Sequence, residues 1–228
     1  MNEQKRLYIS PSLLAADYAD LGTSVRRIEE AGADFLHLDI MDGHFVPNLS
    51  FGPGIVSALR PHSKLIFDVH LMISDPADYL DRFITAGADI ITFHREATDD
   101  PRPLIYRIKD AGVRASIAIS PATPIENVLP YISMLDMILV MTVVPGFGGQ
   151  KLIPETLEKV RALRRHIEDA GLDTDIEVDG GISADNIGLV TAAGANVIVA
   201  GSAIFGSQRP RQTMIAMRTA AKDHPFCG

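Results

Sequence analysis

The stretch AGADFLHLDIMDG, residues 31–43, decides the fold, because it joins a small glycine-containing turn to a short apolar strand. The same phrase returns along the chain, with its turn glycines separated by 55, 25, 59 and 23 residues. Taken as alternating double and single units, these spacings give a period of roughly 23 to 30 residues, the size of one βα unit. We expect each turn glycine to end a helix with a positive φ. The turn glycines are Gly32, Gly87, Gly112, Gly171 and Gly194.

Filling the gaps between these phrases predicts eight strands with helices between them. The predicted strands are residues 7–12, 35–41, 65–71, 90–94, 114–119, 137–142, 175–179 and 197–201. The predicted helices are residues 18–31, 53–60, 76–87, 102–111, 124–131, 154–170, 184–193 and 210–221. Short apolar strands are typical of a buried parallel sheet. The pattern therefore predicts an α/β fold, a (β/α)₈ TIM barrel in one domain over residues 1–228, with a doubly wound open sheet as the alternative.

Composition narrows the range of partners. The chain of 228 residues is 46% hydrophobic and 22% charged, and its net charge of −8 argues against nucleic acid, which attracts clustered Lys and Arg. We expect no signal peptide and no membrane span, because no apolar stretch approaches about 18 residues. The one cysteine, Cys227, allows no intrachain disulfide. These features favour a cytoplasmic enzyme without nucleic-acid or membrane partners.

Polar side chains gather where the predicted strands end, which is where barrel enzymes place their chemistry. Side chains on a strand alternate between its two faces, and the apolar face must pack against the helices. The polar residues of the other face therefore point into the barrel. This inward set comprises His37 and Asp39, then Asp68 and His70, and finally Glu177 and Asp179.

Inward imidazoles and carboxylates are costly to bury without a partner. A lone inward histidine is usually a hydrogen-bonded core residue, and we interpret His94 in that way. Convergence from three strands is harder to explain as core pairing. It predicts a two-His, two-Asp metal site, whose nitrogen and oxygen ligands suit Zn²⁺, Fe²⁺, Mn²⁺ or Co²⁺.

Glycine-rich segments follow the last three predicted strands, at residues 145–150, 180–181 and 201–202. Backbone N–H groups approach an anion closely only where side chains are absent. Glycine also serves tight turns, so one such segment would mean little, but three in succession predict a phosphate site at the end of a barrel. The sequence has no Walker loop, Rossmann fingerprint, CxxC or HExxH motif to support a nucleotide cofactor or zincin chemistry.

Over nearly the whole chain, these motifs resemble those of the ribulose-phosphate 3-epimerase family. The most specific is HLDIMDGHFVPN at residues 37–48. The others are residues 10–17, 68–72, 145–150, 177–181 and 201–205. The resemblance implies a barrel of the ribulose-phosphate-binding type, and a metal-dependent isomerase of the pentose phosphate pathway that interconverts D-ribulose 5-phosphate and D-xylulose 5-phosphate.

The resemblance also implies a role for each site residue. Asp39 would be the proton acceptor and Asp179 the proton donor. One divalent metal ion per subunit would be held by His37, Asp39, His70 and Asp179. The sugar would be contacted by Ser12, His70, Met41, Met72 and Met141. The phosphate end would be contacted by Gly146, Phe147, Gly148, Gly149, Gly180, Gly181, Gly201 and Ser202.

The same resemblance leaves some features open. Val144 stands where we expect the family to carry a polar residue more often, which leaves the geometry of that loop undetermined. We also expect a homo-oligomer that takes a small sugar phosphate.

The predicted chemistry removes the C3 proton beside a C2 ketone, giving an enediolate, and returns a proton to the opposite face. One alternative is a 3-epimerase for a six-carbon ketose phosphate such as allulose 6-phosphate, which would use the same groups. A non-catalytic phosphate-binding barrel would not need the paired Asp39 and Asp179. A decarboxylase or aldolase would want a lysine at a strand end, and no predicted strand ends in one.

Overall fold

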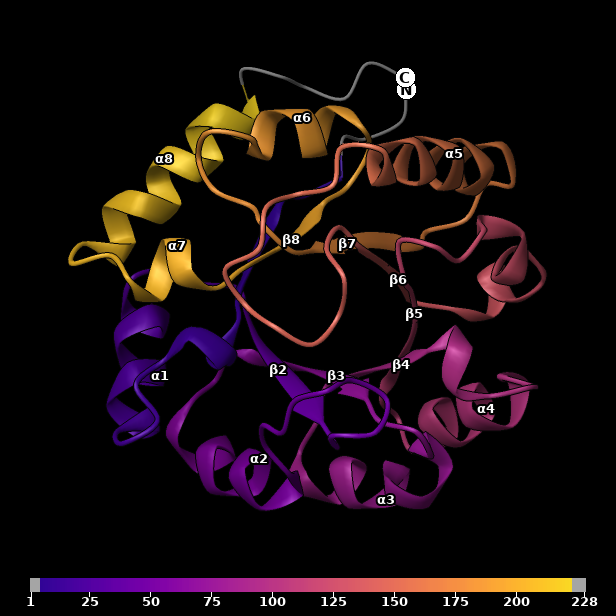
Figure 1. Cartoon of the computed structure of the whole chain (residues 1–228), viewed down its shortest axis with the longest axis horizontal. Coiled ribbons are helices and arrows are strands. Elements are labelled where there is room, and N and C mark those ends of the chain that lie inside the picture. The colour runs from indigo at the N-terminus through magenta and orange to yellow at the C-terminus, as the bar shows by residue number, and fades with distance from the viewer. Residues whose placement is uncertain (1–4, 223–228) are drawn as a thin grey trace.

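The computed structural model describes residues 5–222 and contains eight parallel strands in a nearly closed barrel (Figure 1). From β2 to β8, strands that follow one another in the sequence pair side by side, and β8 pairs with β1. The bridge between Ser12 and His37 joins β1 to β2. The predicted barrel is confirmed. Its strands are β1 (Tyr8–Pro11), β2 (Phe35–Met41), β3 (Ile66–Met72), β4 (Ile90–His94), β5 (Arg114–Ile119), β6 (Met137–Met141), β7 (Asp175–Asp179) and β8 (Val197–Ala200).

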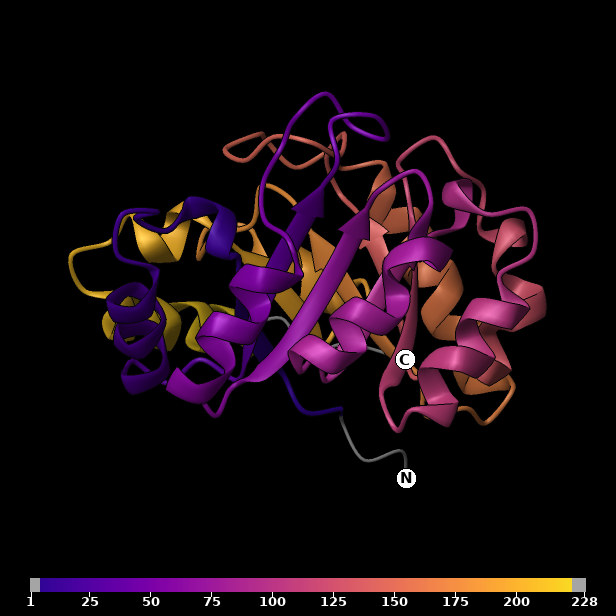
Figure 2. The same cartoon turned by 90° about the horizontal axis from the view of Figure 1, so that it is seen from below.

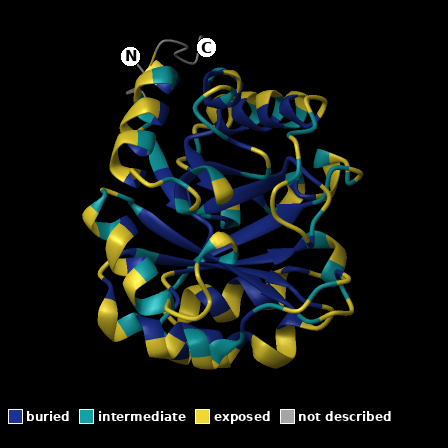
Figure 3. Ribbon diagram, turned by 60° about the vertical axis from the view of Figure 1, so that its left-hand side comes forward, coloured by how far each residue is buried: buried dark blue, intermediate teal, exposed yellow. Residues whose placement is uncertain are grey.

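Helices surround the barrel, with their outer faces exposed and the strands buried (Figures 1 and 3). The α-helices are α1 (Leu21–Glu30), α2 (Pro53–Leu59), α3 (Pro76–Ala86), α4 (Arg102–Asp110), α5 (Thr156–Asp169), α6 (Ile187–Ala192), α7 (Ser202–Phe205) and α8 (Pro210–Lys222). Short 3₁₀ helices are η1 (Leu13–Ala15), η2 (Arg60–His62), η3 (Arg95–Ala97), η4 (Ile125–Asn127) and η5 (Leu129–Met134). Among the described helices, none is both long and apolar enough to cross a membrane. Cys227 lies outside the described residues.

The helix predicted at residues 124–131 is wrong, because this segment forms the two 3₁₀ helices η4 and η5. Pro130 has no N–H to donate and disfavours helical geometry in the residue before it, so an α-helix cannot run through it. The backbone instead closes tighter turns, with the N–H of Val128 donating to Ile125 and that of Tyr131 donating to Val128. The four-residue α7 went unpredicted because it is too short to show a helical period.

The turn glycines of the repeat have the predicted backbone geometry. All five have positive φ angles, from 65° at Gly171 to 113° at Gly194. A side chain in this left-handed region would be strained, which explains why the repeat keeps glycine there.

A second repeat holds the amino-terminal end of the barrel together. The residue directly before each of β2, β4, β6 and β8 pairs with one residue of the preceding strand. Its side-chain oxygen accepts a hydrogen bond from the backbone N–H of that partner residue, and its own backbone N–H donates to the carbonyl of the same partner. We call these four pairs of hydrogen bonds the strand clasps, and the side-chain hydrogen bond of each is 2.8 to 3.0 Å long. The clasps are Asp34 on Ile9, Asp89 on Phe67, Asp136 on Ala115, and Asn196 on Ile176.

The inside of the barrel changes character along its axis. Near the amino-terminal end, Phe35, Ile90, Met137 and Val197 form a buried apolar plug. The strands then run toward the loops at the top of Figure 2, and inward positions become polar. The plug fills the barrel near its amino-terminal end, so the polar inward groups lie toward the loop end.

Candidate active site

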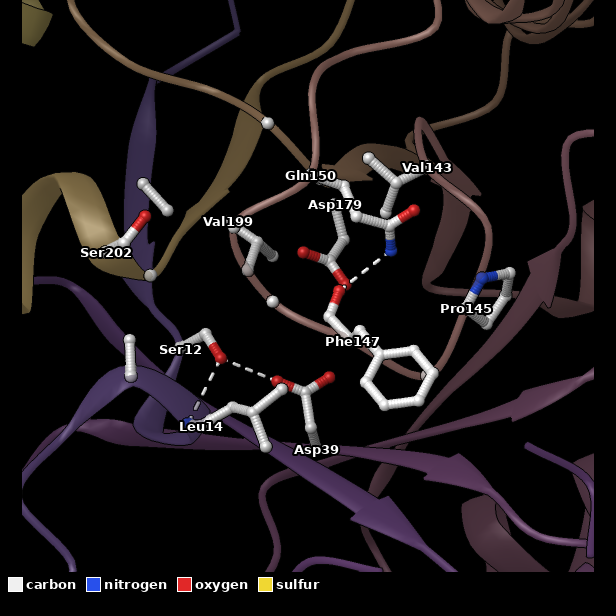
Figure 4. A pocket seen from close by; sticks show the side chains of 18 of the residues that line it. Ser12, Leu14, Asp39, Val143, Pro145, Phe147, Gln150, Asp179, Val199 and Ser202 are labelled. Carbon is white, nitrogen blue, oxygen red and sulfur yellow. Dashed lines mark hydrogen bonds between the residues drawn. The ribbon is translucent and has the colours of Figure 1, made fainter. Parts of the chain in front are cut away.

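The carboxyl ends of the strands open into a cavity of about 640 Å³ (Figure 4). This volume suits a small-molecule ligand. His37 and His70 do not line the cavity and lie fully buried. The predicted site residues that do line it are Ser12, Asp39, Met41, Met72, Met141, Gly146, Phe147, Gly148, Gly149, Asp179, Gly180, Gly181, Gly201 and Ser202.

The four predicted metal ligands lie together at the cavity's inner edge, with one potential donor atom of each within 4.8 Å of the others. The register of β2 with β3 sets Asp39 beside His70, and their Oδ1 and Nδ1 atoms are 3.2 Å apart. The Nε2 of His37 lies 3.3 Å from the same Nδ1 atom of His70. It also lies 3.4 Å from Asp39 Oδ1 and 4.0 Å from Asp179 Oδ2.

The outer nitrogen of each imidazole faces another buried group. His37 Nδ1 lies 2.6 Å from Asp68 Oδ2, and His70 Nε2 lies 2.9 Å from His94 Nε2. When the outer nitrogens carry the protons, both inner lone pairs point at the carboxylate oxygen of Asp39. Such a convergence of acceptors is repulsive unless a proton or a metal cation lies between them, so the donor set fits a divalent metal ion. Metal binding itself stays a prediction.

Charge at the site is distributed unevenly. Burial alone would lower the pKa of His37, but the carboxylates of Asp39, Asp68 and Glu177 outweigh burial and raise that pKa well above its ordinary value. Burial opposes ionisation of Asp39, yet His37 and His70 together hold the pKa of Asp39 well below its usual range. Asp39 is therefore an ionised carboxylate that can accept a proton.

Asp179 differs from Asp39 in its protonation. Burial, and then the negative charge of Asp39, raise the pKa of Asp179 to about 7. Its side chain is 16% exposed, against 4% for Asp39. Figure 4 shows the two carboxylates reaching toward one another from β2 and β7. Two carboxyl groups whose pKa values are pushed in opposite directions are the usual signature of an acid and a base.

Ser12 fixes the second oxygen of Asp39. The hydroxyl of Ser12 donates to Asp39 Oδ2 over 2.6 Å, and its oxygen accepts from the backbone N–H of Leu14 at 3.3 Å (Figure 4). Ser12 is also the N-cap of η1, so its position follows from the backbone turn after β1. Only one oxygen of Asp39 is thereby left to face His37 and His70.

A buried polar layer lies beneath these groups. Within the described residues, the side chains of Ser10, Thr92, Ser116 and Glu177 have polar atoms that are buried without a hydrogen-bond partner. Burial and the charge of Asp68 raise the pKa of Glu177 well above its ordinary value. Unpartnered polar groups in a barrel interior are destabilising, and a chain keeps such groups where function requires them.

His94 is more than the lone core histidine that we predicted from the sequence. It is fully buried, as predicted, but its two nitrogens face His70 and Glu96. Burial lowers the pKa of His94 to about 4. Strand parity could not find this contact, because it links neighbouring strands diagonally. The spacing His94-x-Glu96 was the available signal.

The loop glycines are glycine for different structural reasons. Gly181 has φ of 70°, and a Cβ there would lie 2.3 Å from the backbone nitrogen of Leu152, so loop packing alone requires glycine. Gly201 has φ of −91°, which any residue can adopt. A Cβ on Gly201 would lie 3.3 Å from that of Ala15, at the cavity wall. Contact of these glycines with phosphate stays a prediction.

The loop after β6 covers one side of the cavity. The amide of Gln150 donates to the carbonyls of Val144 and Phe147 at 2.7 and 2.8 Å, which closes the loop on itself. Asn48 donates to the carbonyl of Gly146 at 2.8 Å and ties this loop to the one after β2. Val144, where we expect the family to carry a polar residue more often, contributes its carbonyl here, and the residue is 62% exposed. Sequence analysis did not assign roles to Asn48 or Gln150.

Sequence comparison finds close relatives over the whole barrel. The model of the ribulose-phosphate 3 epimerase family matches residues 8–205. The ribulose-phosphate 3-epimerase of Synechocystis sp. is 44% identical over 223 residues, which cover 97% of each chain. The cytoplasmic isoform from Oryza sativa subsp. japonica is 46% identical and covers 94% of each chain. The Escherichia coli K12 enzyme of the same name is 44% identical, covering 94% of this chain and 96% of its own.

Solved structures of more distant proteins share the fold. A crystal structure of 3-hexulose-6-phosphate synthase superposes with a TM-score of 0.67 at 18% identity, covering 95% of this chain and 99% of its own. The structure of KGPDC from Streptococcus mutans gives a TM-score of 0.70 at 16% identity, covering 96% and 99%. At these identities the likeness concerns the barrel alone.

Proposed function

The chain belongs to the ribulose-phosphate 3-epimerase family and is an isomerase, and we propose that it inverts C3 of D-ribulose 5-phosphate to give D-xylulose 5-phosphate with two aspartates. The observation that carries this proposal is the opposed pair Asp39 and Asp179. They enter one cavity from β2 and β7, one with a lowered pKa and the other with a raised pKa. Inversion requires a base on one face of the carbon and an acid on the other.

The reaction then proceeds in two proton transfers. Asp39 removes the C3 proton, and the electron pair of the broken C–H bond moves toward the C2 carbonyl, giving an enediolate. Asp179 donates a proton to the opposite face of C3, and the electrons return to form the new C–H bond. In the metal-free protein, Asp39 is held ionised and the pKa of Asp179 is raised to about 7, and this asymmetry supports these roles. In the reverse direction the two residues exchange roles.

His37, Asp39, His70 and Asp179 would hold one divalent ion, as their convergence suggests. A bound divalent ion would supply Lewis-acid stabilisation of the negative charge on the C2 and C3 oxygens. Ser12 keeps one oxygen of Asp39 engaged, so the other oxygen stays oriented toward the histidines. Met41, Met72 and Met141 line the cavity with soft, uncharged surface that can tolerate movement of a planar intermediate.

The phosphate end of the substrate would lie against the loops after β6, β7 and β8. Gly148 and Gly201 line the cavity without needing the left-handed backbone, so their missing side chains leave room for an anion. Ser202 adds a hydroxyl beside them. The remaining predicted contacts are Gly146, Phe147, Gly149, Gly180 and Gly181.

The competing reactions find less support at this site. Among the described residues that line the cavity there is no lysine, which a decarboxylase or aldolase on such a barrel would use. A non-catalytic barrel would not need two carboxyl groups held at different pKa values. A six-carbon ketose phosphate would require the same groups, so only relative kcat/KM on the two sugars separates that alternative.

Three further features belong to the proposal. We expect a single domain over residues 1–228, acting as a homo-oligomer. We also expect a cytoplasmic location, as the name of the relative from Oryza sativa states for that protein.

The experiment that tests the proposal combines metal analysis with turnover. The purified protein should contain about one Zn, Fe, Mn or Co ion per chain and convert ribulose 5-phosphate to xylulose 5-phosphate. Removal of the ion with a chelator should abolish turnover, and one of the four ions should restore it. Equal turnover with and without metal would refute the metal site. Faster turnover of allulose 6-phosphate than of ribulose 5-phosphate would change the substrate.

A further inference from the structure

A line of hydrogen-bonding groups runs outward from His70, away from the cavity. His70 Nε2 lies 2.9 Å from His94 Nε2, and His94 Nδ1 lies 3.1 Å from Glu96 Oε2. Both histidines are fully buried, and their ring centroids lie 5.0 Å apart with an interplanar angle of 26°. The mechanism above does not use His94 or Glu96.

The outer end of the line determines which atoms carry protons. Glu96 Oε1 accepts from the backbone N–H of Ser120 at 2.8 Å and from the hydroxyl of Thr123. Glu96 is therefore an acceptor, and His94 must donate to it from Nδ1. The remaining nitrogen of a neutral His94, Nε2, is then an acceptor, so His70 must donate to it from Nε2. This leaves the Nδ1 lone pair of His70 facing Asp39 and His37.

The anchor for Glu96 is itself held in place. Lys159 on α5 donates to the carbonyls of Ser120, Pro121 and Thr123 at 2.6 to 3.1 Å, which fixes the loop after β5. That loop supplies both donors to Glu96. The loop that Lys159 holds in place therefore sets which atoms donate and which accept along the line.

We propose that His94 and Glu96 are positioning residues that hold His70 in the tautomer protonated on Nε2, so that Nδ1 is available as a metal ligand. The proposal rests on the proposed metal site. His37 is served by a different device, since its outer nitrogen meets the carboxylate of Asp68 directly at 2.6 Å. For His70 the carboxylate is that of Glu96, and the imidazole of His94 lies between the two. The orientation of His70 is therefore set through two hydrogen bonds instead of one. Outer partners of this kind typically change metal affinity about 10- to 100-fold when removed.

The test uses two pairs of variants and one control. His94→Leu removes the acceptor for His70, whereas His94→Gln offers a carboxamide oxygen near the same place. Glu96→Ala removes the acceptor for His94, whereas Glu96→Gln keeps the side-chain shape. Glu126→Gln makes the same charge change on an exposed residue of η4 and serves as the control.

Co²⁺ affinity, measured by competition with a chelator, is the first readout. We expect His94→Leu and Glu96→Ala to bind Co²⁺ about 10- to 100-fold more weakly and to show shifted visible absorption bands of the ion. His94→Gln should recover most of the affinity, and Glu126→Gln should equal wild type. Unchanged Co²⁺ affinity in both His94→Leu and Glu96→Ala would overturn the relay while leaving the metal site intact. A wild-type protein that binds no Co²⁺ would overturn the metal site of the proposed function.

A second readout needs no variant, so a failure to fold cannot hide the answer. In the metal-free wild type, long-range nitrogen–proton NMR correlations of labelled histidine report which ring nitrogen is protonated. The proposal requires His70 to carry its proton on Nε2 and His94 to carry its proton on Nδ1. A His70 ring protonated on Nδ1 and bare on Nε2 would refute the relay whether or not the metal binds.

Discussion

The two ends of this barrel are built from the same kinds of residue and behave in opposite ways. At the amino-terminal end, each strand clasp joins two residues by two hydrogen bonds, one to a carboxylate or amide side chain and one between backbone groups. At the carboxyl end, one polar atom each of Asp39, His37 and His70 lie 3.2 to 3.4 Å from one another. Beneath them, Glu177 is buried without a hydrogen-bond partner among the described residues.

The difference shows how one fold separates stability from chemistry. A polar group that is fully hydrogen-bonded stabilises the folded chain, while a buried polar group without a partner costs stability until a ligand or ion meets it. Substitutions at the loop end should therefore change activity more than stability, and substitutions at the clasps should do the reverse.

Replacing Asp39 by asparagine should give the largest effect. The amide cannot act as a base, so turnover should fall about 10²- to 10⁴-fold, and further if the ion is also lost. Some stability should be lost as well, because His37 and His70 stabilise the ionised carboxylate, but the fall in turnover should be the larger effect. Steady-state kinetics and thermal melts of the same preparation check both parts. A variant that loses stability but keeps its turnover would reverse the comparison.

The stability of the metal-free protein should depend on pH through Asp179. Its pKa of about 7 when folded lies above the ordinary value of 3.8, so the folded state binds this proton more tightly. The stabilisation is full below about pH 4 and is lost as the pH rises toward 7, with a slope of at most about 1.4 kcal/mol per pH unit.

Glu177, with its raised pKa, acts in the same direction, so the useful quantity is the difference between wild type and Asp179→Asn. Denaturant melts of both chains from pH 4 to 8, in the presence of a chelator, give this difference. It should grow in favour of the asparagine variant as the pH rises. A difference that does not vary with pH would mean that Asp179 titrates normally.

The clasps should show the opposite response. Asp136→Ala removes the acceptor for the N–H of Ala115 and should destabilise the fold by about 1 to 3 kcal/mol. Its kcat per folded molecule should equal wild type. Asp136→Asn is the matched control, because Asn196 already performs this task with an amide, and most of the stability should return. A loss of kcat in folded Asp136→Ala would show that the two ends are coupled.

The smallest effect concerns the phosphate loops. A methyl group on Gly201 would meet Ala15 at 3.3 Å at the cavity wall, so Gly201→Ala should raise KM for the phosphorylated ketose about tenfold, with little change in kcat. Gly52 has open space around it and does not line the cavity, which makes Gly52→Ala the control. Equal KM values for wild type and Gly201→Ala would place the phosphate elsewhere.

The fold could be predicted from the repeats in the sequence. The turn glycines and apolar strands recur often enough to fix eight units, and parity along β2, β3 and β7 was sufficient to select inward residues. Residues 124–131 were wrongly predicted as a helix, because the effect of Pro130 on the helix propensity of the segment was not considered. The clasp residues Asp34 and Asp89 were visible within the repeated phrase, but their bonds to the preceding strand depend on register, which a repeat does not reveal.

Within the site, strand parity selected His37, Asp39, His70 and Asp179, which the structure brings together from three strands. The contacts of His94 could not be predicted in this way, since its partners are His70 on β3 and Glu96 after β4. The opposite pKa shifts of Asp39 and Asp179 also needed coordinates, because burial and charge spacing cause them.

The most direct test of the central claim follows the hydrogen at C3. When the wild-type enzyme converts ribulose 5-phosphate in deuterated water, an early sample of xylulose 5-phosphate should carry solvent deuterium at C3. Asp179 supplies the incoming proton in this account, and its carboxyl group exchanges with water. Mass spectrometry and proton NMR of the product measure the incorporation. Full deuterium at C3 in the first turnover would support two opposed carboxyl groups, and complete retention of the original hydrogen would contradict them.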